Sequence, residues 1–380
     1  MKEIRPEENG PEKERIETIL REVYSDFIIN AKTLKSAKKM HPQNNQYSQS
    51  PLAFKDILGK LHARQPLAPG ELHDSLIMMM EGAVSDLEIA AFLMGLGPEN
   101  ESIDHIVEAA RALREKAMNI EAPEGTVDCC GTGGDSLKTL NISTAVAIVS
   151  AACGVPVAKH GNRAASSQSG AADILEALDL KLLEDPAKLE KSLENIGFAF
   201  LMAPHHHTSM ANVSKIRKAL GFRTLFNILG PLSNPAGTKI QLVGVYDRAW
   251  LIKIAEALGK LGAEQALVVH GHDGLDEITL TGKTFCAEWT GNDIVEYILT
   301  PDDFGLPGIS IDDIRGGSPE NNAQALSALL GGAQGAYRNI TLANCAALLK
   351  LAGKCDNLKE GVGLAAKAID NGEAMAILND

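Results

Sequence analysis

Four segments of the sequence carry glycine and polar residues directly after short apolar runs. In the first, Gly131-Thr132-Gly133-Gly134-Asp135, the glycines lack side chains, so backbone N–H groups can approach a ligand closely. A helix is expected to begin near Asn141–Thr144, where free N–H groups and the helix dipole favour an anion. Asn141 or Ser143 taken alone would be interpreted as an ordinary helix cap. Together with Lys159 after the next apolar run, the stretch predicts phosphate binding.

A pair of adjacent acids, Asp276 and Glu277, follows another apolar run within a glycine-containing segment. Two carboxylates suit Mg²⁺, which prefers oxygen ligands and often links a protein carboxylate to a substrate phosphate. A solvated acidic turn is the common alternative in an acidic chain. We predict a metal site because the pair is expected at the same sheet edge as Lys159.

Two further groups of cationic or imidazole side chains raise chemical possibilities. The run His205-His206-His207 could suggest zinc, but no Cys or His partner motif accompanies it, so a histidine lining a pocket is favoured. Arg217 precedes the apolar, glycine-containing segment FNILGPLSNPAG. A solvated helix face is the usual interpretation of such an arginine. Beside an apolar pocket, however, it would suit a planar substrate with a carboxylate, held by paired hydrogen bonds.

Short apolar strands that alternate with helices are expected to position these residues. Strands are predicted at 126–130, 155–158, 198–203, 241–246 and 266–270, and helices at 143–153, 171–178, 186–195, 209–219 and 248–261. This alternation predicts a mainly parallel sheet with helices on its faces. Ligands of such sheets bind beyond the carboxyl ends of the strands, so the polar segments should meet at one edge.

The pattern along the whole sequence predicts an α/β protein. It has a small all-helical N-terminal domain and a larger α/β domain whose mainly parallel central sheet is flanked by helices. Residues 1–51 are expected to form an extension, with one amphipathic helix followed by a polar linker. Residues 52–122 form the helical domain, joined by part of 205–225, with helix starts at Ser85 and Ser102. Residues 123–380 form the α/β domain.

Composition excludes several classes of partner. The formal net charge of −13 argues against nucleic acid and anionic lipid as main partners. No apolar run reaches the ~20 residues of a membrane span, and the charged N-terminus lacks a signal-peptide core, so a cytoplasmic location is expected. The six cysteines form no CxxC motif and are expected to be mostly buried thiols.

The motifs together resemble the anthranilate phosphoribosyltransferases, of the nucleoside phosphorylase/phosphoribosyltransferase class III-like family. The resemblance covers roughly residues 52–380 and is carried by GTGGD, NIST, KHGNR, FLMAPHHHTSM, IRKALGFRTLFNILGPLSNP, HGHDGLDEIT, LTPDDFGL and the RGG at 315–317. It implies transfer of the phosphoribosyl group of phosphoribosyl pyrophosphate (PRPP) to anthranilate in tryptophan biosynthesis. It also implies that two Mg²⁺ ions are bound. It further implies a homodimer formed through the helical domain. Association with anthranilate synthase is left open.

The resemblance also implies roles for individual residues. Lys159, Asp276 and Glu277 would be catalytic, and the Mg²⁺ ligands would be Ser143, Asp276 and Glu277. PRPP would be held by Gly131, Gly134, Asp135, Thr139, Asn141, Ile142, Ser143, Thr144, Lys159, His160, Gly161, Asn162, Arg163, Ala164, Ala165, Ser166, Ser167 and Ala171. Anthranilate would be held or guided by Gly131, Asn162, Arg217, His160, His207 and Pro231.

The sequence departs from the family pattern at a few positions. Leu140 stands where Phe is expected, Thr208 where Pro is usual, Asp179 where Gly is usual, and Ala164-Ala165 replace a Ser-Val pair. Three alternatives remain: a nucleoside phosphorylase of the same architecture, a nucleic-acid-binding relative of this fold, and an enzyme with another aromatic acceptor. The acidic charge disfavours the second. No histidine is assigned as the proton acceptor, and residues 1–51 are given no role.

Overall fold

A computed structural model describes residues 53–97, 100–135, 137–164 and 168–379. The predicted N-terminal helix and linker of residues 1–51, and three predicted site residues, Ala165, Ser166 and Ser167, lie outside these ranges. Within them, every helix is too short or too polar to cross a membrane.

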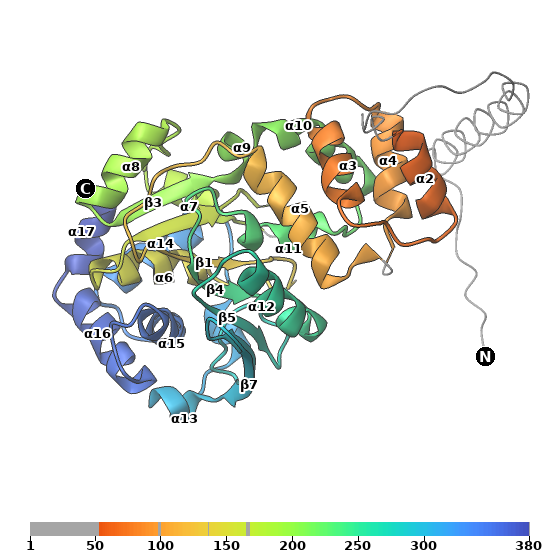
Figure 1. Cartoon of the computed structure of the whole chain (residues 1–380). Coiled ribbons are helices and arrows are strands. Elements are labelled where there is room, and N and C mark those ends of the chain that lie inside the picture. The colour runs from red at the N-terminus through yellow and green to blue at the C-terminus, as the bar shows by residue number, and fades with distance from the viewer. Residues whose placement is uncertain (1–52, 98–99, 136, 165–167, 380) are drawn as a thin grey trace, which may run out of the picture. The chain divides into compact units, whose positions relative to one another are not determined.

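Four helices open the described chain: α2 (Phe54–His62), α3 (Glu71–Met80), α4 (Asp86–Gly95) and α5 (Ile103–Glu115). The two predicted starts are confirmed. Ser85 and Glu88 form a reciprocal capping box at α4, and the Ser102 hydroxyl accepts from the N–H of His105 at α5. The later helix α10 (Ala211–Leu220) packs against α3 and α4 (Figure 1).

One seven-stranded sheet, in the order β3-β2-β1-β4-β5-β6-β7, forms the centre of the α/β part. Its strands are β1 (Val127–Gly131), β2 (Val157–Gly161), β3 (Phe198–Met202), β4 (Ile240–Gly244), β5 (Gln265–Gly271), β6 (Thr284–Trp289) and β7 (Ile294–Leu299). The first five strands pair in parallel, as predicted, whereas β6 and β7 extend the sheet as an antiparallel hairpin that the sequence pattern does not predict.

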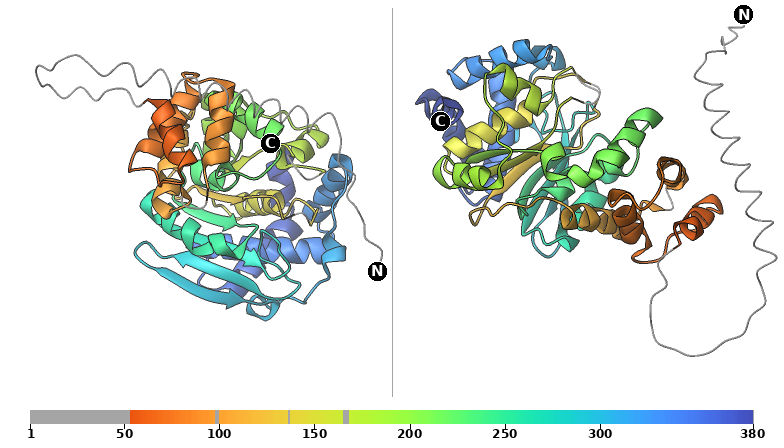
Figure 2. Two further views of the ribbon diagram at one scale, coloured as in Figure 1. Left: turned by 90° about the vertical axis from the view of Figure 1, so that its right-hand side faces the viewer. Right: turned by 90° about the horizontal axis from the view of Figure 1, so that it is seen from above.

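Alternate strand residues face different helices, because successive side chains of a strand point to opposite sides. Val157 and Phe200 belong to the large core cluster with α6 (Ile142–Ala152) and α15 (Ala336–Leu351). Ala158 and Leu201 instead contact α8 (Pro186–Asn195). Helix α12 (Leu251–Lys260) packs on β5 and β6 (Figure 2). The other helices are α7 (Ala171–Ala177), α9 (Ala203–His206), α11 (Phe226–Leu229), α13 (Pro301–Phe304), α14 (Pro319–Leu330), α16 (Leu358–Asp370) and α17 (Glu373–Asn379).

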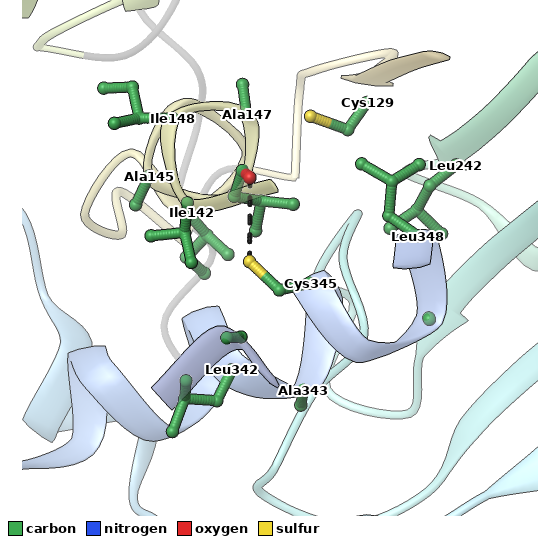
Figure 3. Packing of buried hydrophobic residues seen from close by; sticks show 14 of the residues in the cluster. Cys129, Ile142, Ala145, Ala147, Ile148, Leu242, Leu342, Ala343, Cys345 and Leu348 are labelled. Atoms are coloured by element: carbon green, nitrogen blue, oxygen red, sulfur yellow. Dashed lines mark hydrogen bonds between the residues drawn. The ribbon is translucent and has the colours of Figure 1, made fainter. Parts of the chain in front are cut away.

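The contact between α6 and α15 is the centre of the large core (Figure 3). Ala145 of α6 and Ala343 of α15 are both fully buried in this core. The thiol of Cys345 donates to the carbonyl oxygen of Val146 over 3.6 Å (Figure 3, dashed line). This packing fixes α6, whose N-terminus faces the predicted phosphate site, against the C-terminal helices.

Candidate active site

The glycine loop after β1 interlocks with the acid pair. Gly133 and Gly134 have φ angles of 68° and 84°, which few other residues adopt. The N–H of Gly133 donates to Oδ2 of Asp276 over 2.8 Å. A Cβ atom at Gly131 would overlap the Asp276 carboxylate, and one at Gly244 would overlap the Asp276 carbonyl oxygen. Glycine is therefore required at these positions for the acid-bearing loop to close over the strand ends.

The N-terminus of α6 is left open by its own cap residue. Asn141 is the N-cap, but its side chain makes no capping hydrogen bond. Instead it donates to the carbonyl oxygen of Ser169 over 3.2 Å and accepts from Nδ2 of Asn322 over 2.9 Å. The simple capping interpretation is thus wrong for Asn141, and the first turn keeps its affinity for an anion.

Three carboxyl groups gather beside this helix start. Burial and the neighbouring Asp276 raise the pKa of Glu277 to about 8, and the Ser143 hydroxyl hydrogen-bonds its carboxylate. Burial also raises the pKa of Asp276, and burial together with Asp276 raises the pKa of Asp135 to about 6. Buried acids held above their usual range favour a cation as partner.

The donor set fits a cation that prefers oxygen. Ser143, Asp276 and Glu277 supply one hydroxyl and two carboxylates. Among the described residues, no three His, Cys, Asp or Glu side chains converge as ligands of one ion. Two carboxylates that leave room for substrate oxygens are the pattern expected of Mg²⁺ rather than of a closed protein cage.

Lys159 lies within strand β2, close to Glu277, rather than in a loop. The sequence pattern predicts it after the strand, but β2 runs on to Gly161, and Lys159 is only 2% exposed. Its Nζ donates to the carbonyl oxygen of Cys129 over 2.8 Å. Burial disfavours the ammonium, but nearby acidic groups, Cys129, Asp128 and Glu277 among them, hold the pKa of Lys159 above its ordinary value.

The neighbouring His160 belongs to a second group on the other side of β2. Its Nδ1 lies 3.0 Å from the carbonyl oxygen of Gly230, and its ring centroid lies 5.4 Å from that of His207. Burial lowers the pKa of His160 to about 3, and burial with His206 nearby lowers the pKa of His207 to about 4. Both rings are therefore neutral near pH 7. Pro231, also predicted here, is buried beside Gly230.

The three consecutive histidines have separate partners. His205 lies 3.6 Å from Glu184, His206 contacts the carbonyl oxygen of Met118 at 2.6 Å, and His207 contacts that of Ser233 at 3.1 Å. Nothing in this arrangement directs the three rings to a single ion.

Arg217 is half-buried in α10, near its C-terminal end. Its guanidinium lies 5.1 Å from the ring centroid of Phe226, and Nη2 lies 3.4 Å from Oδ1 of Asn227. Burial lowers the pKa of Arg217, yet the group stays charged. An arginine against an aromatic ring, with a single long hydrogen bond, has donors to offer a planar carboxylate.

The loop after β2 is partly held by α7. The N–H of Ala172 donates to the carbonyl oxygen of Asn162 over 3.3 Å, and Ala171 adjoins Gly161. Arg163 pairs with Glu176 and Asp173, two acids of α7. The N–H of Ala164 donates to the Asp173 carboxylate over 2.9 Å. Thr139 forms an isolated antiparallel bridge with Arg315.

Sequence reasoning misses two residues of this region. Asp128 is fully buried, accepts from Nδ2 of Asn234 over 2.8 Å and from the N–H of His160 over 3.2 Å, and burial raises its pKa to about 6. Its signal is a charged residue within an apolar strand. Arg223 donates to the carbonyl oxygen of Gly134 and stacks 4.0 Å from the ring centroid of Tyr246.

Known proteins share both parts of this chain. The α/β domain of the glycosyl transferase family matches residues 123–375, and the helical bundle domain of that family matches residues 55–117. The anthranilate phosphoribosyltransferase of Parvibaculum lavamentivorans is 49% identical over 325 residues, which cover 86% of this chain and 95% of that protein. That of Rhodospirillum rubrum is 48% identical over 84% of this chain and 92% of its own length.

Solved structures agree with the sequence relatives. The anthranilate phosphoribosyltransferase of Thermus thermophilus superimposes with a TM-score of 0.80 at 40% identity, covering 85% of this chain and 97% of that one. The Saccharomyces cerevisiae enzyme in complex with PRPP and Mg also gives 0.80, at 30% identity, covering 87% of this chain and 97% of that one.

Proposed function

Because this chain belongs to the anthranilate phosphoribosyltransferases of the glycosyl transferase family, we propose that it performs their reaction. It transfers the 5-phosphoribosyl group of PRPP to the amine of anthranilate, releasing pyrophosphate, in tryptophan biosynthesis. The observation that carries the proposal is the meeting of the glycine loop, the open start of α6, Lys159 and the pair Asp276–Glu277 at one sheet edge.

The proposed diphosphate site combines three sources of positive potential. The glycine loop beyond Gly133, whose own N–H is donated to Asp276, and the first turn of α6 would face the anion, and the buried Lys159 ammonium would add its charge from β2. Thr139, Asp135 and the Gly161–Ala171 segment would enclose the ribose and its phosphate. Charge builds up on the departing pyrophosphate, so donors fixed in advance stabilise the transition state more than the ground state.

The proposed cofactor is Mg²⁺, with two ions bound. Ser143 and Glu277 would hold one ion, and Asp276 with Glu277 the other. Bound there, Mg²⁺ would neutralise charge on the pyrophosphate oxygens. The hydrogen bond from Gly133 N–H fixes Asp276, and the Ser143 hydroxyl fixes Glu277, so both carboxylates are oriented before substrate arrives.

The acceptor site is proposed next to the PRPP site, beyond the carboxyl end of β2 and toward its His160 side. Arg217 and Asn162 would hold the anthranilate carboxylate, while His160, His207, Pro231 and Gly131 line the route. The aniline nitrogen attacks as a neutral amine and needs no strong base to begin. The low pKa values of His160 and His207 agree with this, because neither ring would be an effective general base at neutral pH.

We further propose a homodimer formed through the helical domain. Leu87 and Met94 of α4 are 42% and 58% exposed, and a second subunit would cover such apolar side chains. We also propose two domains: a helical domain of residues 52–122 joined by part of 205–225, and an α/β domain of residues 123–380. The packing of α10 on α3 and α4 supports this division. The cytoplasm remains the proposed location.

The proposed function is tested by mixing the protein with PRPP, Mg²⁺ and anthranilate and following the loss of anthranilate fluorescence. Loss that requires all three additions is the expected result. Unchanged fluorescence, with phosphorolysis of a nucleoside by inorganic phosphate instead, would assign the chain to the phosphorylases of this architecture. Retention on DNA that weakens with salt would favour the nucleic-acid-binding alternative.

A further inference from the structure

The acid pair is carried by a loop whose backbone is anchored on both sides. Before the pair, Asp273 accepts from the N–H of Leu275 over 3.1 Å and from the Thr279 hydroxyl over 2.8 Å. After the pair, Ile278 is fully buried and makes its backbone hydrogen bonds to a side chain. The position of Glu277 thus depends on what holds Ile278.

That side chain is Asn344, from the middle of α15. Its Oδ1 accepts from the N–H of Ile278, and its Nδ2 donates to the carbonyl oxygen of Ile278, each over 2.9 Å. The same Nδ2 donates to the carbonyl oxygen of Ile340 over 2.9 Å, which fixes the orientation of the amide. Asn344 therefore pairs with Ile278 as a neighbouring strand would, with one donor and one acceptor.

An asparagine at this position is not explained by packing. Asn344 is 0% exposed, on a helix whose neighbouring residues Ala343, Cys345 and Ala346 are buried in the apolar core. A buried amide is tolerated only when its hydrogen bonds are made, and an apolar side chain would fill the space without that requirement. What the amide contributes is a fixed backbone directly after Glu277.

The same helix also contacts the other half of the proposed metal site. The hydroxyl of Tyr337, two turns before Asn344, donates to the carbonyl oxygen of Asn141 over 3.1 Å. Asn141 is the N-cap of α6, two residues before Ser143. Helix α15 thus holds the segments that carry Ser143 and Glu277 from one side.

We infer that Asn344 is a positioning residue for the metal-binding carboxylate of Glu277. This inference rests on the proposed function, because it takes Glu277 as a Mg²⁺ ligand. Partners behind the first ligands typically account for about 10- to 100-fold in metal affinity or activity. The effect should appear in metal binding and PRPP use, while the acceptor site across β2 is unaffected.

The test compares Asn344→Leu with Thr341→Val. Both residues are fully buried in α15, but the Thr341 hydroxyl donates to the carbonyl oxygen of Tyr337 within the helix and does not touch the acid loop. Mn²⁺ binding in the presence of PRPP is measured from the loss of the free-ion paramagnetic resonance signal. The Mg²⁺ concentration for half-maximal rate and the anthranilate KM are measured in parallel.

We expect Asn344→Leu to weaken Mn²⁺ binding and raise the Mg²⁺ requirement at least about tenfold, with the anthranilate KM within about twofold of wild type. For Thr341→Val, the Mn²⁺ affinity, the Mg²⁺ requirement and the anthranilate KM should all stay within about twofold of wild type. Equal losses in both variants, or wild-type Mn²⁺ binding by Asn344→Leu, would overturn the inference. If Asn344→Leu does not fold, Asn344→Ser takes its place with the same criteria. A wild-type protein that binds no Mn²⁺ would instead overturn the proposed metal site.

Discussion

Lys159 and His160 are neighbours in β2, yet their side chains bond on opposite faces of the sheet. The Lys159 ammonium reaches the carbonyl oxygen of Cys129 on the α6 side, whereas the His160 ring contacts that of Gly230 on the other. Successive residues of any strand diverge in this way. In the proposed reaction, one strand would thus supply a group to each of two substrates, which must meet beyond the carboxyl ends of the strands.

Replacement of Lys159 by Met should impair the use of PRPP selectively. The ammonium is a preorganised donor next to the proposed diphosphate, and loss of such a donor costs about 10²- to 10³-fold in rate. We expect kcat/KM for PRPP to fall by that order, measured from initial rates of fluorescence loss. Lys191→Met, which removes an exposed lysine of α8, is the matched control. A change confined to the anthranilate KM would refute the assignment.

Replacement of Arg217 by Ala should act on the other substrate. A hydrogen bond to a charged group contributes about 1.5–3 kcal/mol, so the anthranilate KM should rise about 10- to 100-fold while the PRPP KM changes little. Steady-state kinetics with each substrate varied in turn measures this. Lys218→Ala, at the exposed next position, is the control and should behave as wild type. An effect on PRPP alone would contradict the placement of anthranilate at Arg217.

Metal binding should depend on pH through Glu277. Burial and Asp276 raise its pKa from 4.5 to about 8, so the metal-free protein keeps a proton there at neutral pH, and a cation must displace it. Apparent Mn²⁺ affinity should therefore rise up to about tenfold per pH unit below pH 8 and level off above it. Titrations at several pH values measure this, and Glu277→Gln should bind Mn²⁺ weakly and lose the rise in affinity between pH 7 and 8. A flat wild-type profile would show that Glu277 is already ionised.

The same proton affects stability with a definite sign. Between pH 4.5 and about 8 the folded metal-free protein holds a proton on Glu277 that the unfolded chain has released. The free energy of unfolding contributed by this group is therefore greatest at low pH and falls as pH rises through that window. Urea unfolding across the window should show this fall, and saturating Mg²⁺ should reduce it. Glu277→Gln, which cannot lose a proton there, is the control, and an identical pH profile in this variant and the wild type would contradict the assignment.

Local motifs predict the chemistry, whereas contacts between distant segments do not follow from them. Gly131, Gly133 and Gly134 and the acids at 276–277 can be recognised in the sequence because each group occupies a short stretch with an unusual composition. The bond of Asn344 to Ile278 joins residues 66 positions apart, and that of Asn234 to Asp128 joins residues 106 apart. Such pairs depend on the tertiary fold, and a single asparagine in a sequence gives no sign of its partner.

Strand prediction fails where the burial pattern is irregular. In the edge strand β7, Val295, Glu296 and Ile298 are all exposed. Apolar and polar residues therefore do not alternate along this strand between a buried and an exposed face. Only pairing with β6 defines it. The predicted end of β2 is too early because Lys159 and His160 look like loop residues. Inside the strand, Nζ of Lys159 and Nδ1 of His160 each have a backbone carbonyl oxygen as partner, whereas Nε2 of His160 is buried without one.

Two glycines of α16 should respond to alanine in opposite directions. At Gly361 a Cβ atom would lie 2.8 Å from Cα and 3.0 Å from the carbonyl oxygen of Ala346 in α15, so alanine must push the helices apart. Overpacking of this kind costs about 1–3 kcal/mol. At Gly363 a Cβ atom meets nothing within 4 Å, and alanine should stabilise the helix by about 0.5–1 kcal/mol, because it has less backbone entropy to lose. Urea unfolding of both variants measures the difference. Equal effects at the two positions would show that α16 does not pack on α15 as closely as described.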